Sequence, residues 1–180
     1  MPITINLKSA VFAVSDALDL VGVSDFQHGK RVAMIARETA LLLQPDAEPI
    51  TDPRLAEINY GEVEGLPIKR LAACYPELVA AWNCGEDAPF PGGENSADVQ
   101  RRLHEFLDAI KAETASPILV VTHNVVVRCV LGELLGVPLH DWHKLRVNHL
   151  DGFEVIRRGD QLYLSLTEAQ KAGLTDSLLK

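Results

Sequence analysis

This sequence has little positive charge and few cysteines, and both shortages exclude classes of function. Seventeen lysines and arginines stand against 25 aspartates and glutamates, which gives a net charge of −8. Because no basic run occurs, the chain lacks the surface that a nucleic-acid binder presents to phosphates, and an anionic ligand would need a local basic pocket. Cys74, Cys84 and Cys129 show no Cys-x-x-Cys spacing. An odd number of thiols suits a reducing compartment, so we expect a cytoplasmic protein.

Long hydrophobic runs are absent as well. The apolar runs are too short to span a bilayer, and the first six residues lack the basic start of a signal peptide, so we expect no membrane partner. The chain is 47% hydrophobic and 23% charged, which is enough to bury one core, and it contains no internal repeat and no linker. We therefore expect a single domain over residues 1–180, with a polar tail at 168–180.

The strongest local pattern lies at residues 117–124. Residues 118–121 are apolar without polar alternation, which favours a central strand covered on both faces, as in a parallel sheet between helix layers. Asn124 suits the N-cap of a following helix, for which Gly136 is a stop signal. His123 then falls at the carboxyl end of a strand, beside helix N–H groups that favour an anion. This position suits chemistry on a phosphate or a carboxylate.

The remaining segments predict helices and short strands. Hydrophobic spacing favours helices over 9–21 and 31–43, and Leu42 and Leu43 belong to the expected buried face of the second. Ser96 can cap a further amphipathic helix. The other expected elements are a strand at 3–7, a surface loop at 50–65, helices within 67–82 broken at Pro76, and a hairpin over 153–166.

Four segments in a fixed order resemble the histidine phosphatase superfamily, which includes cofactor-dependent phosphoglycerate mutases and broad-specificity phosphatases. They read DPRLAEINYGEVEGL at 52–66, YPE at 75–77, FPGGE at 90–94 and VVTH at 120–123. The resemblance covers roughly residues 36–166. It implies a phosphoglycerate mutase-like α/β fold: a three-layer α/β/α sandwich with a mostly parallel central sheet and the active cleft at the carboxyl ends of the strands.

The resemblance also implies a mechanism without a cofactor or a metal. In this family one histidine attacks phosphorus to form a phosphohistidine, which water then hydrolyses. Cationic donors hold the phosphoryl oxygens, since these need fixed positive charge as the transferred group passes between oxygens. By motif, His123 matches the second, phosphate-binding histidine. Glu64 matches the acid that protonates the leaving oxygen and later activates water.

The first 35 residues depart from the family pattern. Members typically open with Arg-His-Gly, which is absent from this sequence, and the closest trace is Gln27-His28-Gly29. If this segment has been rebuilt, we expect His28 to serve as the nucleophile. Arg31, Arg37 and Asn124 are then the expected phosphate-binding residues. A family member that has lost its catalytic activity, a gene truncation or a frameshift near residue 35 would show the same departure from the family pattern.

Three hypotheses for function follow. The first is a phosphatase that acts on a small phosphorylated metabolite through a phosphohistidine. The second is a non-catalytic relative that binds an anionic ligand or a partner. The third, ranked last because its spacing is unspecific, is a metal-dependent hydrolase that uses His140, His143 or His149 with Glu64.

Two further expectations concern substrate and assembly. A mutase is less favoured than a phosphatase, because residues 52–82 offer only Arg54, Lys69 and Arg70 to hold a second charged group. A sheet without the family's usual second strand would expose an edge, and an exposed edge favours pairing with another chain. We therefore expect a homodimer.

Overall fold

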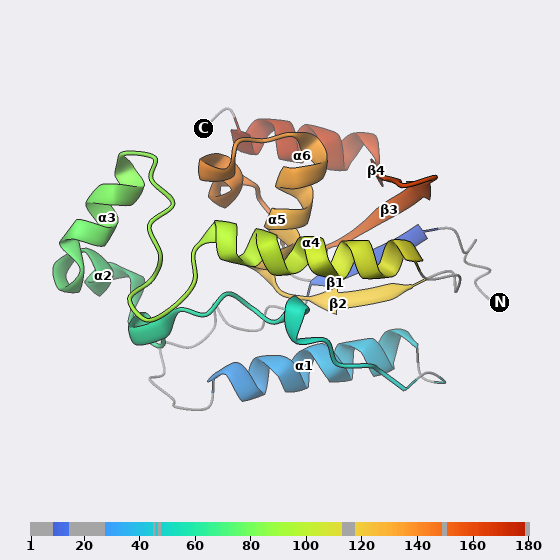
Figure 1. Cartoon of the computed structure of the whole chain (residues 1–180), viewed down its shortest axis with the longest axis horizontal. Helices are drawn as coiled ribbons and strands as arrows, with labels where there is room; N and C mark the ends of the chain where they lie inside the picture. Colours follow the sequence, from blue (N-terminus) through green and yellow to red (C-terminus); the bar gives the residue numbers. More distant parts are fainter. Residues whose placement is uncertain are drawn as a thin grey trace.

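The computed structural model describes residues 9–14, 28–44, 46, 48–112, 118–148 and 151–178, with the backbone alone at 9–14, 28–35, 68 and 177. The described strands form one four-stranded sheet in the order β2-β1-β3-β4 (Figure 1). They are β1 (Ser9–Val14), β2 (Leu119–Thr122), β3 (Gly152–Arg158) and β4 (Gln161–Ser165). The strand predicted at 3–7 lies outside the described residues.

Helices cover both faces of this sheet. They are α1 (His28–Leu43), α2 (Ile68–Cys74), α3 (Pro76–Asn83), α4 (Ser96–Ala112), α5 (Asn124–Leu135) and α6 (Glu168–Leu178). Figure 1 shows α1 on the opposite side of the sheet from α5 and α6, while α2 and α3 project beyond one end of the sheet. The expected three-layer α/β class is confirmed. No helix among the described residues is both long and apolar enough to cross a membrane.

The prediction of a helix from residue 9 is wrong for its first part. Residues 9–14 form β1, which pairs in parallel with β2 on one side and antiparallel with β3 on the other. A short apolar run such as SAVFAV fits a buried strand as well as a buried helix, and strand pairing from both sides decides between them. Residues 15–21 of the predicted helix lie outside the described residues.

The described sheet is mixed, which corrects the expectation of a mostly parallel one. β1 and β2 are parallel, but β1–β3 and β3–β4 are antiparallel. β2 was predicted to be central, yet it stands at one end of the strand order. Its side chains alternate accordingly: Val120 and Thr122 are buried, whereas Leu119 and Val121 are half-buried. The homodimer stays a prediction.

Other predicted elements are confirmed, with one correction at α1. The helix break at Pro76 separates α2 from α3, and the predicted hairpin is β3–β4. α1 spans the predicted 31–43 and begins earlier, at His28. Leu42 and Leu43, however, are 81% and 51% exposed, so the apolar face of α1 is not buried at its last turn.

The start of α4 is capped by residues that precede the predicted Ser96. Asn95 Oδ1 accepts from the Asp98 N–H at 2.9 Å, and Asp98 Oδ2 accepts from the Asn95 N–H at 3.2 Å. This reciprocal pair satisfies N–H groups at the start of the helix, as a capping box does. The Asp87 carboxylate accepts from the Ser96 and Ala97 N–H groups at 3.0 and 2.9 Å. Ser96 is therefore the first helical residue rather than the cap.

The buried core joins α4, α5 and the sheet. One cluster combines the predicted apolar face of α4 with residues of β2, α5 and β3; its members include Val99, Leu103, Phe106, Val120, Val126, Val130 and Val155. A second cluster packs α5 against Phe153 of β3 and Leu174 of α6. Because α5 belongs to both clusters, its first turn and the adjoining end of β2 are held firmly in place.

Candidate functional site

The site is built where β2 ends and α5 begins. His123 directly follows β2, has extended backbone angles (φ −111°, ψ 166°) and occupies the N-cap position of α5. Its carbonyl accepts the first helical hydrogen bond, from the Val127 N–H at 3.0 Å. The N-cap is thus His123, whereas Asn124 was expected in that role. The prediction that His123 lies at a strand end beside a helix N-terminus is confirmed.

The His123 side chain is buried and incompletely satisfied. The residue is 6% exposed, and its Nδ1 atom is buried without a hydrogen-bond partner among the residues that the structure describes. Burial, together with the positive charge of Arg102, lowers the pKa of His123 to about 4. The imidazole is therefore neutral near pH 7, and its buried Nδ1 keeps an unused capacity for one hydrogen bond within the described part of the chain.

Two residues of α5, Asn124 and Arg128, differ in the hydrogen bonds that their side chains form. Asn124 Nδ2 donates to the Val147 carbonyl at 3.1 Å, so this amide joins the helix start to the segment after residue 144. Arg128 lies one helical turn further on, and its Nε atom is buried without a hydrogen-bond partner. The Arg128 charge acts on the neighbouring Cys129 thiol, whereas the charge that acts on His123 is that of Arg102. Asn124 has a structural partner, while Arg128 has unused donor capacity.

The acidic loop carries Glu64 at the end of a 3₁₀ helix formed by Gly61–Val63. Glu64 is exposed, and its N–H donates to the Gly61 carbonyl at 3.2 Å. Gly61 has φ +55°, and a Cβ built there would lie 2.1 Å from the Pro91 carbonyl oxygen. The Glu62 N–H donates to that same carbonyl at 2.8 Å. The loop is thus packed directly on the backbone of the segment before α4.

The structure does not bring every predicted phosphate ligand to His123. The Arg37 guanidinium pairs with Glu38 at 3.1 Å, and both side chains are more than half exposed. His28 and Arg31 lie in the first turn of α1, where the structure describes the backbone and not the side chains. Of the Gln27-His28-Gly29 segment, the structure describes His28 and Gly29, and both belong to α1. The roles of these three residues remain predictions.

Two of the three histidines considered for a metal are among the described residues. His140 and His143 are exposed in a 3₁₀ helix at Leu139–Lys144, and His140 Nε2 lies 3.5 Å from Asp141 Oδ2. His149 lies outside the described residues. Within the described part of the chain, no group of three or more histidine, cysteine, aspartate or glutamate side chains is placed to hold a metal ion.

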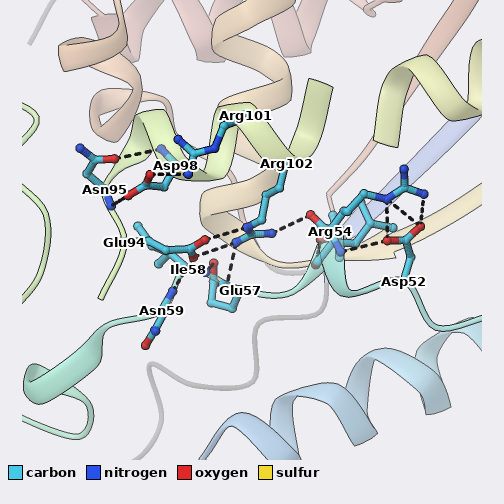
Figure 2. A network of polar contacts seen from close by, with 12 residues as sticks. Asp52, Arg54, Glu57, Ile58, Asn59, Glu94, Asn95, Asp98, Arg101 and Arg102 are labelled. Atoms are coloured by element: carbon cyan, nitrogen blue, oxygen red, sulfur yellow. Dashed lines mark hydrogen bonds and ion pairs between the residues drawn. The ribbon is translucent and has the colours of Figure 1, made fainter. Parts of the chain in front are cut away.

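A polar network that the sequence pattern did not indicate surrounds Arg102 (Figure 2), whose charge also acts on His123. Arg102 of α4 donates to the Glu94 carboxylate and to the carbonyls of Arg54 and Glu57. Arg54 itself holds Asp52, with Nη2 2.6 Å from Asp52 Oδ2. Arg102 stands on the wetter side of an amphipathic helix, where an arginine is ordinarily solvated. Only its spacing from the predicted FPGGE segment could have drawn attention to it.

The described pocket is not at His123. It has a volume of about 470 Å³ and lies between residues 74–78, at the α2–α3 junction, and Pro89 and Pro91. None of its lining residues is a predicted site residue.

The family assignment rests on a match over most of the chain. The sequence model of the histidine phosphatase superfamily (branch 1) matches residues 30–167, and the chain belongs to this superfamily. The predicted resemblance is confirmed. The match begins after residues 1–29, which include β1 and the first two residues of α1.

Sequence relatives are phosphoglycerate mutase-like. A probable phosphoglycerate mutase GpmB of Yersinia pestis (strain Pestoides F) is 37% identical over 106 residues, which are 56% of this chain and 47% of that protein. A protein of the same description from Yersinia pseudotuberculosis serotype O:1b (strain IP 31758) matches to the same extent. The chain spans about half the length of these curated relatives.

Solved structures share the fold at low sequence identity. Bacillus stearothermophilus YhfR superposes with a TM-score of 0.70 and 20% identity, over 88% of this chain and 95% of that chain. The alpha-ribazole phosphatase from Shigella flexneri gives 0.64 and 22%, over 76% and 70%. Mycobacterial glucosyl-3-phosphoglycerate phosphatase gives 0.61 and 19%, over 89% and 97%. The fold is therefore that of the histidine phosphatases.

Proposed function

We propose that this chain binds the phosphoryl group of a small phosphorylated metabolite at His123 and hydrolyses it through a phosphohistidine. The observation that carries the proposal is the buried, neutral imidazole at the start of α5 with its Nδ1 unpartnered. A buried polar atom without a partner is costly, so its presence at a helix N-terminus favours an anionic ligand that supplies the missing acceptor or donor. Membership of the histidine phosphatase superfamily supports phosphate as that anion.

In this proposal three kinds of group bind the phosphoryl oxygens: backbone N–H groups, an arginine and the His123 imidazole. The N–H groups of the first α5 turn and the helix dipole favour negative charge at this point. Arg128, whose Nε is buried and unpartnered, is the described cation best suited to join them. His123 gives the ligand a hydrogen-bond partner from a nitrogen shielded from water, where electrostatic interactions are stronger.

The chemistry in this proposal needs two further groups. A nucleophilic imidazole forms a bond to phosphorus while the bond from phosphorus to the leaving oxygen breaks, and we assign this role to His28. A carboxylic acid gives its proton to the leaving oxygen and then, as a carboxylate, takes a proton from the attacking water; we assign it to Glu64. Water completes the cycle by displacing His28 from phosphorus, which releases phosphate.

The test is hydrolysis of p-nitrophenyl phosphate between pH 5 and 8, together with binding of inorganic phosphate by calorimetry. We expect turnover that is lost in both His28→Ala and His123→Ala. Phosphate binding should weaken by about tenfold or more in His123→Ala and in Arg128→Ala, since each variant removes one charge-assisted or buried hydrogen bond.

Arg101→Ala is the control. The Arg101 guanidinium pairs with Asp98 and the Arg101 side chain is 69% exposed, so this variant should bind phosphate within about twofold of the wild type. Turnover that survives in His28→Ala would exclude His28 as the nucleophile. Phosphate affinity that is unchanged in both His123→Ala and Arg128→Ala would overturn the proposed site.

A second candidate function is a non-catalytic relative that binds an anion at the same place. It is favoured by the absence of Arg-His-Gly from the sequence and by the pairing of Arg37 with its exposed neighbour Glu38. Phosphate binding that depends on His123, without hydrolysis across pH 5–8, would select this function over the phosphatase.

A further inference from the structure

The Arg102 guanidinium joins α4 to two other segments of the chain (Figure 2). Its Nε lies 3.0 Å from Glu94 Oε1, and its Nη2 lies 3.2 Å from Glu94 Oε2. On the other side, Nη1 donates to the Arg54 carbonyl at 2.6 Å and Nη2 donates to the Glu57 carbonyl at 3.2 Å. The Arg102 side chain is 16% exposed, so these bonds are largely shielded from water.

The two carbonyls belong to the irregular segment that leads to the acidic loop. Outside regular helices and strands, backbone carbonyls need partners from elsewhere in the chain. Arg102 donates to the carbonyls of residues 54 and 57. Its ion-pair partner Glu94 satisfies an N–H group further along the same segment, because Glu94 Oε2 accepts from the Asn59 N–H at 2.9 Å. The backbone reinforces this link, with the Glu94 N–H donating to the Asn59 carbonyl at 2.8 Å.

The same segment is attached to the strand that precedes His123. Thr122, the last residue of β2, is fully buried, and its hydroxyl donates to the Leu55 carbonyl at 2.7 Å. The segment is thus bonded to β2 through the Leu55 carbonyl and to Arg102 of α4 through the carbonyls of residues 54 and 57. It is also bonded to Glu94 through Asn59. Beyond Asn59 it continues through Gly61 to Glu64, whose place relative to His123 depends on these attachments.

The guanidinium also influences His123 itself. Its positive charge acts with burial to lower the pKa of His123, so the two side chains share one electrostatic environment. A lysine could keep the charge but could not reproduce the network, because a single ammonium cannot form the planar fork that contacts a carboxylate and two carbonyls together. The geometry therefore distinguishes a positional role for Arg102 from a purely electrostatic one.

We propose that Arg102 is a positioning residue, which holds the Glu64 loop in place against the end of β2 that carries His123. This inference rests on the proposed function for its effect on turnover. Its structural part, the fixing of the loop, can be tested without turnover.

Hydrogen exchange of the loop amides tests the structural part. In Arg102→Lys we expect the Asn59 and Glu62 N–H groups to exchange at least about tenfold faster, while amides within α4 keep their protection. Arg101→Lys is the matched control, because Arg101 is the adjacent residue and makes only a surface pair with Asp98, with its side chain 69% exposed. Loop protection that is unchanged in Arg102→Lys would overturn the proposal.

Kinetics separate positioning from a general loss of structure. Arg102→Lys should lower kcat for p-nitrophenyl phosphate by about tenfold or more with KM within about threefold, because phosphate binding is kept and the acid is misplaced. Glu64→Gln should then have a smaller effect in the Arg102→Lys background than in the wild type, since both changes act on one step. A loop that loses protection while kcat is unchanged would overturn the positioning role.

A second variant covers the case in which Arg102→Lys does not fold. Glu94→Gln keeps the size of the side chain but weakens the two-point contact with Arg102, and it should give the same changes in exchange and kcat at smaller amplitude. No change in either measurement would overturn the proposal. If the wild type shows no hydrolysis at all, the proposed function fails, whereas the exchange rates of these variants still decide whether Arg102 fixes the loop.

Discussion

The Thr122 hydroxyl donates a hydrogen bond to the backbone carbonyl of Leu55, 67 residues earlier in the chain, at 2.7 Å. Thr122 directly precedes His123, and Leu55 lies at the start of the segment that leads to the acidic loop. This one bond joins the two motifs on which the proposed site depends. It also explains why a hydroxyl is buried completely at the end of an otherwise apolar strand.

Replacement of Thr122 should show how much this bond contributes. Thr122→Val keeps the shape but leaves the Leu55 carbonyl without its donor, and we expect a loss of about 1–3 kcal/mol in the free energy of unfolding. Urea denaturation measures the change. Thr122→Ser, which keeps the hydroxyl, should retain most of the stability that Thr122→Val loses. Wild-type stability in Thr122→Val would contradict the prediction, and a loss in Thr122→Ser as large as that in Thr122→Val would mean that the methyl group contributes as much as the hydrogen bond.

The pKa of His123 predicts a pH-dependent stability. The group titrates near 6.5 when unfolded and near 4 when folded, so between these values the unfolded chain binds more protons. Stability should therefore fall as the pH drops from about 6.5 to about 4, by up to about 3 kcal/mol from this residue. His123→Gln should flatten the profile in that window. The control His104→Gln, at a half-exposed side chain paired with Glu133, should leave the profile steep.

The position of β1 predicts a large effect of proline there. Ala13 pairs with Val121 of β2 and with Gly152 of β3, so a proline removes an N–H from a strand with neighbours on both sides. Ala13→Pro should destabilise the fold by about 3 kcal/mol or more. Ala13→Gly keeps the N–H and should cost only about 1 kcal/mol. Similar melting temperatures for the two variants would argue against a paired strand at this position.

Gly93 packs closely against the backbone of Asn59, in the segment that leads to the acidic loop. A Cβ at Gly93 would lie 2.2 Å from the Asn59 carbonyl oxygen, and that backbone cannot move without breaking its bonds to Glu94. Gly93→Ala should destabilise the fold by about 2 kcal/mol or more. Gly173→Ala, on α6 with open space around it, should instead stabilise it by up to about 1 kcal/mol. Chemical denaturation of the two variants measures the contrast.

Much of the fold could be predicted wherever the local pattern allowed a single interpretation. The spacing of Val99, Leu103 and Phe106 allows only an amphipathic helix, and the structure buries all three on α4. The break at Pro76 follows from the missing N–H of proline. Residues 9–14 were predicted incorrectly, because a short apolar run fits a helix or a strand. Pairing with β2 and β3, which are distant in sequence, makes that choice.

For the site, the sequence by itself determined that His123 would stand at a strand end before a helix, since an apolar run, a polar residue and a second apolar run permit little else. It also determined, through the motifs around Glu64 and Gly93, membership of the histidine phosphatase superfamily. Only the tertiary structure decided that His123 is buried with an unpartnered nitrogen and that Arg37 faces Glu38 at the surface. It alone placed Arg102 of α4 against two other segments of the chain, one with Arg54 and Glu57 and one with Glu94. Those outcomes depend on contacts between residues far apart in sequence, which no local periodicity encodes.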